Sequence, residues 1–311
     1  MAAYQLPARD ELGFCNILLS ALGGDGANMS AKLLFKIGCT EFGLDGGYDA
    51  RYGSEKKGTA TDVSVRFCDL GNPVRQAGPT NRPHFLVVFH ENMIEPCELY
   101  RGLHPGAVVI VNSTKRPADL RPALHLHSGR IVCVDATRIA FEVGGRLNMP
   151  LLAALAHELR FPDEAIKRAV VKQWPRAEKA NLTAYEKSVA EAASAEFAQD
   201  GFALLPPTQS RGAIGWRNML NGGTVDALTH TTAGRDNRIA AQGRVPRFDP
   251  AACNSCSICM TVCSDPGGLM WQQGRLTGVD DRFCKGCMRC VEVCPPTKKG
   301  KGLTTPEEAV A

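Results

Sequence analysis

Two segments near the C-terminus decide how part of this chain folds: CNSCSICMTVC at residues 253–263 and CKGCMRCVEVC at residues 284–294. Both have the spacing Cys-x2-Cys-x2-Cys-x3-Cys, and together they hold eight of the 13 cysteines. Each cysteine of the second segment lies 31 positions after its counterpart in the first, so the pair is an internal duplication without a shift in register. Pro295 follows the second segment, whereas Ser264 follows the first.

This spacing is typical of ligands to [4Fe–4S] clusters. A cubane has four iron corners that each take one thiolate, and three cysteines spaced by two residues reach three corners from one tight loop. In two-cluster ferredoxins the fourth cysteine of each run ligates the other cluster. We therefore predict a bacterial-type two-cluster ferredoxin domain of α+β fold over residues 251–311. The ligands of one cluster are predicted to be Cys253, Cys256, Cys259 and Cys294, and those of the other Cys284, Cys287, Cys290 and Cys263.

Zinc is the alternative metal that such a cysteine-rich segment could bind. Structural zinc sites need four ligands, commonly two CxxC pairs separated by a longer gap, and the third cysteine at x2 has no simple role there. Between the two segments, Leu269–Val279 with Gly274 at its centre predicts a β-hairpin, entered through a turn at Asp265–Gly268. A basic tail follows at Lys298, Lys299 and Lys301; it is either a solvated tail or a steering surface for an acidic electron acceptor.

Residues 1–200 alternate between strand and helix patterns. The apolar run Phe14–Leu22 predicts a buried strand, and a helix over Ala27–Ile37 follows the glycine turn. Further strands are predicted at Val63–Phe67, Phe85–Phe89, Val108–Val111 and Ile131–Val134, and helices at Met149–Leu159, Pro162–Trp174 and Leu182–Gln199, the last stopped by Gly201. This alternation predicts an α/β domain with a mostly parallel sheet. Residues 201–250, rich in Pro and Gly, are predicted to form an extended connector.

The turn Gly23-Gly24-Asp25-Gly26 has some features of a dinucleotide-binding loop. Ala21 stands where the first glycine of that motif belongs, and Asp25 would place a carboxylate against the pyrophosphate. Asp45, at the distance of a ribose-binding acid, lies within Gly43–Gly47, which is predicted to be a loop. A tight strand-to-helix turn is favoured, and an NAD-dependent iron–sulfur oxidoreductase is kept as an alternative.

The composition is that of an ordinary globular protein, with 44% hydrophobic and 22% charged residues. A net charge of +4 gives no argument for nucleic acid, and no apolar stretch reaches the roughly 18 residues that span a bilayer. The N-terminus has no signal-peptide pattern. We expect a cytoplasmic protein without nucleic acid or membrane partners. The scattered cysteines Cys15, Cys39, Cys68, Cys97 and Cys133 are predicted to be buried core residues.

Several blocks, in order, resemble the gamma domain of the pyruvate/2-oxoacid:ferredoxin oxidoreductase family, followed by that family's delta (ferredoxin) domain. The gamma blocks are Gly23–Gly26 (the family usually has Gln at the position of Asp25), Tyr52–Ala60, Asn112-Ser113, Asp135–Ala140, Asn148–Leu152 and Asn181–Tyr185. The delta blocks are Trp216-Arg217 and Asp281–Cys287. The gamma resemblance runs from about Phe14 to Ala190, and the delta resemblance covers about Gly212 to Lys301.

The resemblance implies an electron-transfer and assembly subunit with no catalytic residue of its own. Family enzymes decarboxylate a 2-oxoacid with thiamine pyrophosphate and Mg on other chains, and electrons pass through a third [4Fe–4S] cluster and the two delta clusters to ferredoxin. The expected partners are alpha and beta subunits in a dimer of heterotrimers. A gamma–delta fusion also resembles oxalate oxidoreductase, which leaves oxalate and pyruvate as candidate substrates. A free ferredoxin-like carrier is the other alternative, although it would not need some 200 further residues.

Overall fold

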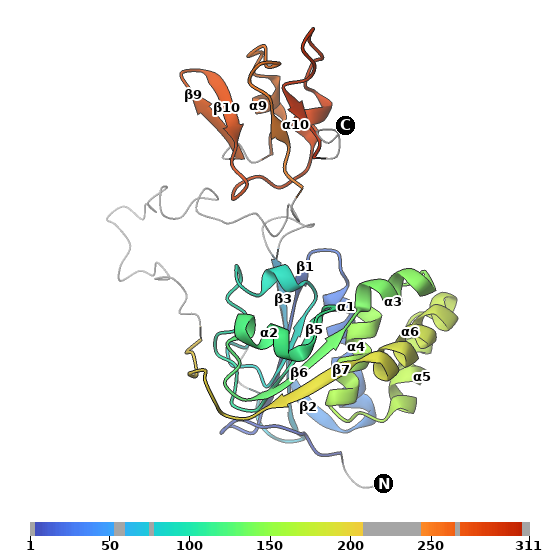
Figure 1. Cartoon of the computed structure of the whole chain (residues 1–311). Coiled ribbons are helices and arrows are strands. Elements are labelled where there is room, and N and C mark those ends of the chain that lie inside the picture. Colours follow the sequence, from blue (N-terminus) through green and yellow to red (C-terminus); the bar gives the residue numbers. More distant parts are fainter. Residues whose placement is uncertain (1–3, 53–59, 75–77, 208–243, 265–267, 307–311) are drawn as a thin grey trace, which may run out of the picture. The chain divides into compact units, whose positions relative to one another are not determined.

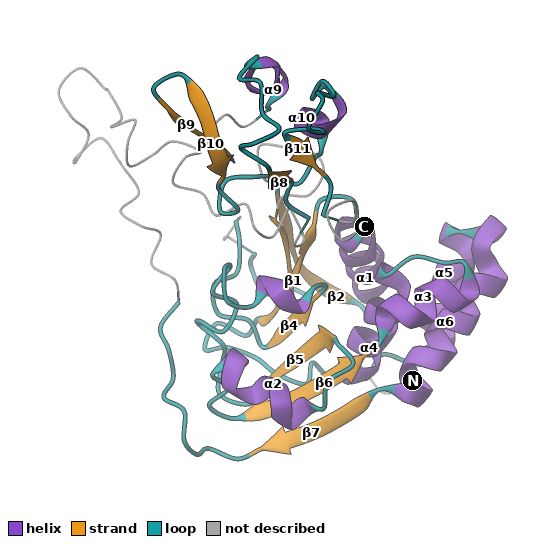
Figure 2. Cartoon of the chain, turned by 45° about the horizontal axis from the view of Figure 1, so that its top comes forward, coloured by secondary structure: helices purple, strands orange, loops and turns teal. Residues whose placement is uncertain are grey.

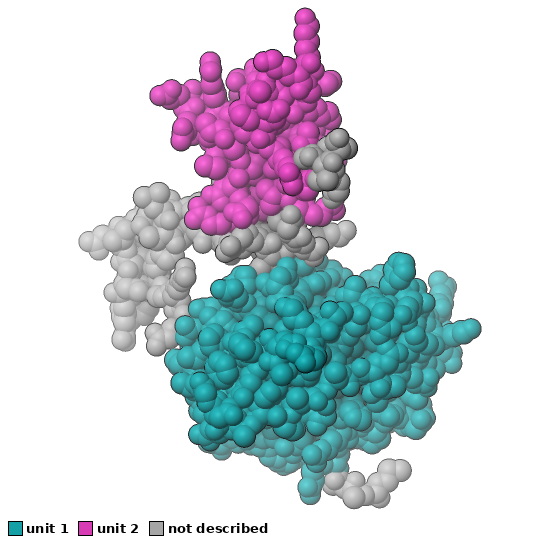
Figure 3. Space-filling view, viewed as in Figure 1, with its two compact units in different colours: residues 1–211 teal, residues 212–311 magenta. Residues whose placement is uncertain are grey.

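The structure is a computed structural model that describes residues 4–52, 60–74, 78–207, 244–264 and 268–306 (Figure 1). The chain divides into two compact units, residues 1–211 and 212–311 (Figure 3). Most of the predicted connector, most of the block at 52–60, the pair Trp216-Arg217 and most of the turn at 265–268 lie outside the described residues. Among the described residues, no helix combines the length and apolar character needed to cross a membrane.

A seven-stranded sheet in the order β2-β3-β1-β4-β5-β6-β7 forms the centre of the first unit. Its strands are β1 (Cys15–Leu22), β2 (Leu44–Arg51), β3 (Ala60–Asp69), β4 (Phe85–Val88), β5 (Ala107–Asn112), β6 (Gly129–Val134) and β7 (Ala193–Phe197). Strands β1, β4, β5 and β6 are neighbours in this order and pair in parallel. Strand β3 runs antiparallel to β1 and β2, and β7 runs antiparallel to β6. Five of the seven strands therefore point the same way, which confirms the mostly parallel α/β fold.

Helices cover both faces of this sheet. They are α1 (Ala27–Glu41), α2 (Pro117–Leu124), α3 (Ala136–Val143), α4 (Asn148–Glu158), α5 (Asp163–Gln173) and α6 (Glu178–Glu191), with short 3-10 helices at Glu91–Met93 and Pro175–Ala177. Figure 2 shows α2 on one side of the sheet and the longer helices on the other. Nine consecutive residues of α4, Asn148 to Ala156, are buried. A helix that is buried all round lies inside a core, and α4 is the element on which the neighbouring helices pack.

The predicted helix over Leu182–Gln199 is wrong in its second half. Helix α6 ends at Glu191, Ala192 is extended, and residues Ala193–Phe197 form β7. This strand pairs antiparallel with β6, from Cys133 opposite Ala193 to Gly129 opposite Phe197. The Ala and Glu residues favour a helix locally, but pairing with β6 satisfies the backbone of both strands, and such tertiary pairing overrides local propensity.

The prediction of a loop at Gly43–Gly47 is also wrong, because β2 begins at Leu44 and pairs with β3 along its whole length. Glycines are rare inside strands, so the pattern did not indicate one. At Gly46 the glycine has a structural reason: a Cβ placed there would lie 1.9 Å from the carbonyl oxygen of Arg66 in the neighbouring strand. Glycine inside a strand often marks such a close backbone approach.

The second unit is small and of α+β character. It contains α9 (Ile258–Val262), α10 (Arg289–Glu292), the hairpin of β9 (Leu269–Gln272) and β10 (Arg275–Val279), and the short pair β8 (Arg247–Phe248) and β11 (Leu303–Thr304). The predicted hairpin is confirmed, with Gly274 in the left-handed region at φ 76°. Among its described residues, six form a buried cluster, namely Cys259, Leu269, Leu276, Cys290, Val291 and Leu303. Two of these six are themselves predicted cluster ligands.

The scattered cysteines all lie in the first unit. Cys15, Cys68 and Cys133 are buried as predicted, whereas Cys39 and Cys97 are only partly buried. The prediction of a core position is therefore wrong for these two, since a small side chain on a half-covered surface carries no pattern that distinguishes it from a core position.

Replacing Gly46 by Ala tests the close strand approach. The Cβ would overlap the Arg66 carbonyl, so we expect Gly46→Ala to reduce the free energy of unfolding of the first unit by about 1–3 kcal/mol. Gly47→Ala is the matched control in the same strand, because its nearest neighbour is Cγ1 of Val74 at 3.4 Å. Urea unfolding followed by hydrogen exchange in peptides of β1–β3 measures both. Equal stability of the two variants would contradict the assignment of β2.

Candidate iron–sulfur centres

The two cysteine loops share one backbone conformation as well as one sequence spacing. Ser255 and Gly286, 31 positions apart, are both left-handed, with φ of 57° and 65°. Ser257 and Met288, also 31 positions apart, have φ of 63° and 60° and directly precede α9 and α10. A left-handed conformation costs a non-glycine residue roughly 1–2 kcal/mol. Alternation of left- and right-handed residues turns successive N–H groups toward one concave side, a geometry found at anion and iron–sulfur sites.

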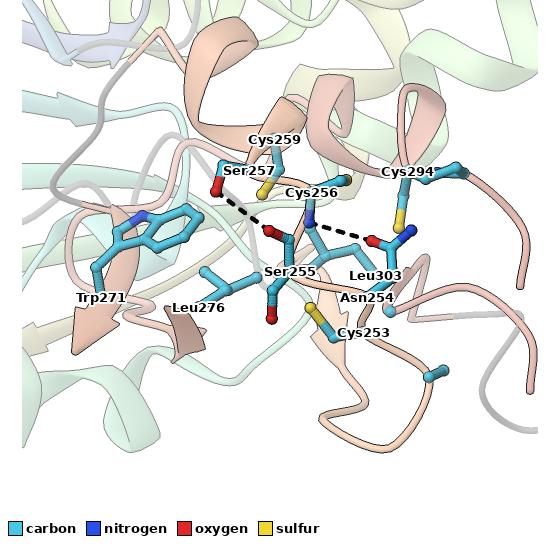
Figure 4. A pocket seen from close by; sticks show the side chains of 13 residues that line it. Cys253, Asn254, Ser255, Cys256, Ser257, Cys259, Trp271, Leu276, Cys294 and Leu303 are labelled. Atoms are coloured by element: carbon cyan, nitrogen blue, oxygen red, sulfur yellow. Dashed lines mark hydrogen bonds between the residues drawn. The ribbon is translucent and has the colours of Figure 1, made fainter. Parts of the chain in front are cut away.

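The first pocket collects thiols from both cysteine segments. It is lined by Cys253, Cys256, Cys259 and Cys294 and has an empty volume of about 380 Å³, open solvent included. Trp271 and Leu276 of the hairpin and Leu303 of β11 also line it, so its surroundings are largely apolar. Figure 4 shows the thiols of Cys253, Cys259 and Cys294 on different sides of this space, with the Trp271 ring at one end.

The second pocket repeats this arrangement with the roles of the segments exchanged. It is lined by Cys284, Cys287, Cys290 and Cys263 and has the same empty volume, about 380 Å³. Leu269, Val279 and Met288 line it together with two cationic residues, Lys285 and Arg289. The structure thus brings each predicted quartet of cysteines to one pocket, with the last cysteine of each run in the pocket of the other. The ligation of iron by these thiols stays a prediction.

A glycine backs the first cysteine of each loop. A Cβ on Gly302 would lie 3.0 Å from Cα of Cys253, and a Cβ on Gly268 would lie 3.0 Å from Cα of Cys284. An added Cβ at either glycine would lie closer than an ordinary van der Waals contact. The backbone of each loop therefore approaches the glycine more closely than a residue with a side chain would allow. The sequence analysis did not single out Gly268 or Gly302, since they lie 34 positions apart and do not follow the 31-residue repeat.

The electrostatics of the pockets suit metal-bound thiolates. Burial, and to a lesser extent the charges of Cys284 and Cys287, raises the pKa of the Cys290 thiol to about 12. Burial likewise raises the pKa of Cys259. Four thiolates therefore do not share such a pocket without compensating charge, which bound iron supplies because a coordinating thiol is deprotonated outright.

One residue that lines the first pocket, Trp271, carries an unpartnered polar atom. Its Nε1 is buried and has no hydrogen-bond partner among the described residues. An unsatisfied buried donor costs about 1–3 kcal/mol. The donor set and the apolar walls of the pocket fit an iron–sulfur cluster.

The glycine turn of the α/β unit is closed by its own side chains. Oδ2 of Asp25 accepts a hydrogen bond from the Leu22 backbone N–H at 2.9 Å and lies 2.7 Å from Nε2 of His90. Gly26 precedes α1 with φ 89°, and a Cβ there would lie 2.9 Å from the Asn148 side chain. The turn packs α1 onto α4 and holds a carboxylate where a pyrophosphate would bind. This geometry favours the tight strand-to-helix turn, and His90 is a partner that the sequence analysis missed.

An α/β unit joined to a module with two four-cysteine pockets is the organisation of an iron–sulfur oxidoreductase subunit. Residues 16–191, more than half of the chain, match the family described as pyruvate ferredoxin/flavodoxin oxidoreductase. The chain belongs to this family. Residues 245–295 match a 4Fe-4S dicluster domain.

The relatives are gamma-type subunits. The "Pyruvate/ketoisovalerate oxidoreductases common subunit gamma" of Thermococcus kodakarensis is 30% identical over 155 residues, which is 47% of this chain and 80% of the relative. "Pyruvate synthase subunit PorC" of Methanosarcina barkeri is 26% identical over 142 residues, 45% of this chain and 75% of the relative. The crystal structure of pyruvate oxidoreductase subunit PORC from Thermotoga maritima matches with a TM-score of 0.52 and 25% identity, covering 59% of this chain and 99% of that one. The resemblance to a gamma-type subunit is confirmed.

Removing iron should unfold the second unit and leave the first intact. Among the described residues, the buried cluster of the second unit has six members and that of the first has 35, so we expect the second unit to depend more on bound metal for its stability. Anaerobic chelation followed by hydrogen exchange should deprotect peptides of β9, β10 and α10, while peptides of β1 and α4 keep their protection. Unchanged protection in the second unit after full loss of iron would contradict this expectation.

Proposed function

We propose that this chain is the electron-transfer and assembly subunit of a thiamine pyrophosphate-dependent 2-oxoacid:ferredoxin oxidoreductase. One observation carries the proposal: each pocket of the second unit is lined by four cysteines, three from one run and the last from the other. This module follows a domain of the pyruvate ferredoxin/flavodoxin oxidoreductase family on the same polypeptide.

The pocket linings support the proposed ligand sets. We assign Cys253, Cys256, Cys259 and Cys294 to one [4Fe–4S] cluster and Cys284, Cys287, Cys290 and Cys263 to the other. Bound clusters of this type accept and pass on one electron at a time. The chain itself supplies the thiolates, the apolar walls that limit water, and the glycine contacts that fix the start of each loop. The proposed domains are 1–200 (gamma), 201–250 (connector) and 251–311 (delta, ferredoxin).

The α/β unit has an assembly role in this proposal. Its glycine turn is filled by Asp25 and His90, and we assign no catalytic residue in this chain. The relatives are named as subunits, one of them as a common subunit of two oxidoreductases, which supports a chain that works with separate partners. Those partners are proposed to be alpha and beta subunits that hold thiamine pyrophosphate, Mg and a third [4Fe–4S] cluster, in a dimer of heterotrimers. A ferredoxin takes up the electrons, and the complex works in the cytoplasm.

Pyruvate and oxalate are the two substrates proposed for the whole complex. Pyruvate is supported by the names of the relatives. Oxalate is supported by the fusion of gamma and delta domains on one chain. The substrate pocket lies on the partner chains in this proposal, so only the assembled complex can distinguish the two.

Exchange of the crossing cysteines tests the ligand sets. We expect Cys263→Ser to remove one cluster, about four of eight irons, because one corner of the second pocket loses its thiolate. Alkylation mapped by mass spectrometry should then label Cys284, Cys287 and Cys290 while Cys253, Cys256 and Cys259 stay protected. Cys294→Ser should give the reverse pattern.

Cys39→Ser is the control for those variants, since Cys39 is a partly buried cysteine of the first unit and lines neither pocket. It should keep full iron and full protection. If Cys263→Ser instead exposed the thiols of its own run, each run would serve a single cluster and the crossed assignment would be wrong.

Anaerobic viologen reduction by the purified complex tests the substrate. Oxalate, pyruvate, 2-oxoglutarate and indolepyruvate would be compared with and without coenzyme A. Activity on oxalate that needs no coenzyme A would establish oxalate, and strict coenzyme A dependence with pyruvate would establish pyruvate. A chain that purifies alone, with bound NAD(H) and no thiamine-binding partner, would overturn the proposed function.

A further inference from the structure

The described start of the predicted connector is attached to the first unit. Residues 198–207, here called the strap, follow β7 and form neither a helix nor a strand (Figure 2). Seven of these ten residues are exposed, and the other three, Phe202, Leu205 and Pro207, are partly buried. The strap therefore gains little from apolar burial, and its attachment depends on specific polar and aromatic contacts.

Arg121 of α2 holds the first half of the strap. Its side chain is only 15% exposed, and its Nη2 donates hydrogen bonds to the carbonyl oxygens of Ala198 at 3.0 Å and Asp200 at 3.1 Å. The same nitrogen donates to the Asp200 carboxylate. The guanidinium also lies over the rings of Phe197 and Phe202, at 4.8 and 5.4 Å from their centroids. One cation thus holds the beginning and the middle of the strap through charge-assisted hydrogen bonds and cation–π contacts.

Two backbone carbonyls attach the second half of the strap. Nδ1 of His127 donates a hydrogen bond to the Phe202 carbonyl oxygen at 2.5 Å. The Gly102 backbone N–H donates to the Leu205 carbonyl oxygen at 3.0 Å. A Cβ on Gly102 would lie 3.1 Å from Cα of Pro207, so the end of the strap approaches this glycine closely. The strap is therefore attached both to the α2 region and to the loop before β5.

This attachment depends on few groups. Arg121, His127 and Gly102 supply the hydrogen bonds that hold the strap, whereas the core cluster of the first unit has 35 buried residues. Segments with few buried apolar contacts open locally at a lower free energy than the core on which they lie. The division between the two compact units falls between residues 211 and 212, after the strap. The attached strap thus counts as part of the first unit, although it is the part that opens most readily.

We propose that the strap is a releasable latch that sets how far the second unit can move from the first. While Arg121 holds the strap, the free part of the connector begins after Pro207, and when the strap is released it begins at Ala198. Ten residues span at most about 33–36 Å when fully extended, so release lengthens the reach of the second unit by up to that distance. This inference goes beyond the proposed function and does not depend on what the cysteine pockets bind.

Hydrogen exchange of the full-length chain at the Gly102 amide tests the latch, because this N–H donates to the strap carbonyl of Leu205. In the wild-type chain it should exchange at least about tenfold faster than the amides of β1 and α4. Arg121→Ala should speed its exchange by about a further tenfold and leave β1 and α4 unchanged. A wild-type Gly102 amide that exchanges as slowly as the core, or an Arg121→Ala rate equal to the wild-type rate, would overturn the inference.

Two further variants separate release of the strap from damage to α2. Arg116→Ala is the matched control, since Arg116 precedes the same helix, pairs with Asp119 and has a side chain that is 84% exposed. It should keep the wild-type rate at Gly102. Asp200→Ala with Phe202→Ala removes the partners of Arg121 on the strap and leaves α2 unchanged, and it should reproduce the fast exchange. If Arg121→Ala does not fold, a wild-type rate in this double variant overturns the inference.

Small-angle X-ray scattering of the same full-length samples measures the reach. We expect Arg121→Ala to increase the maximum dimension of the chain, by no more than about 33–36 Å, and Arg116→Ala to leave it unchanged. Unchanged dimensions in a variant whose Gly102 amide exchanges fast would overturn the latch. None of these substitutions changes a residue that lines a cysteine pocket, so a wild-type chain without iron would reject only the proposed function.

Discussion

The exchange of the last cysteine between the two runs is the constraint on which the second unit depends. Cys294 lines the pocket of the first loop and Cys263 lines that of the second, so neither loop completes its donor set alone. In the part of this unit that the structure describes, the buried cluster has six residues, and two of them are cysteines of the pockets. Small domains of this kind commonly rely on metal for stability. In the proposed function, the same crossed thiols would serve both electron transfer and the stability of the unit.

Most of the fold follows from the sequence because its strands are buried on both sides. β1, β4, β5 and β6 are apolar runs inside a parallel sheet, and their residues carry the signal directly. The two errors, at β2 and β7, both fall on the edges of the sheet. An edge strand pairs on one side only and is less covered, so its residues carry a weaker strand signal. Its conformation depends more on the neighbouring strand than on its own propensity. Gly46 has no room for a side chain because the Arg66 carbonyl oxygen lies beside it, and Ala193–Phe197 is extended because it pairs with β6.

Some residues of the cysteine pockets could be predicted from the local sequence, whereas others act through contacts between distant parts of the chain. The cysteines could be found from spacing because three ligands reach a cubane from one loop, and the left-handed residues follow the same 31-residue repeat. Gly268, Gly302 and Trp271 could not, because each acts on a loop that is distant in sequence and none repeats at that interval.

The glycine turn of the first unit is filled by its own side chains. A glycine turn between β1 and α1, at the carboxyl end of a parallel strand, offers N–H groups to an anion. In this chain the anion is the Asp25 carboxylate, which accepts a hydrogen bond from the Leu22 backbone N–H and pairs with His90. A pyrophosphate would have to displace that carboxylate and meet its charge, while the close contact of Gly26 with Asn148 leaves no room for the turn to shift toward α4. The residues that fill this turn also fasten α1 to α4, the buried helix of the domain.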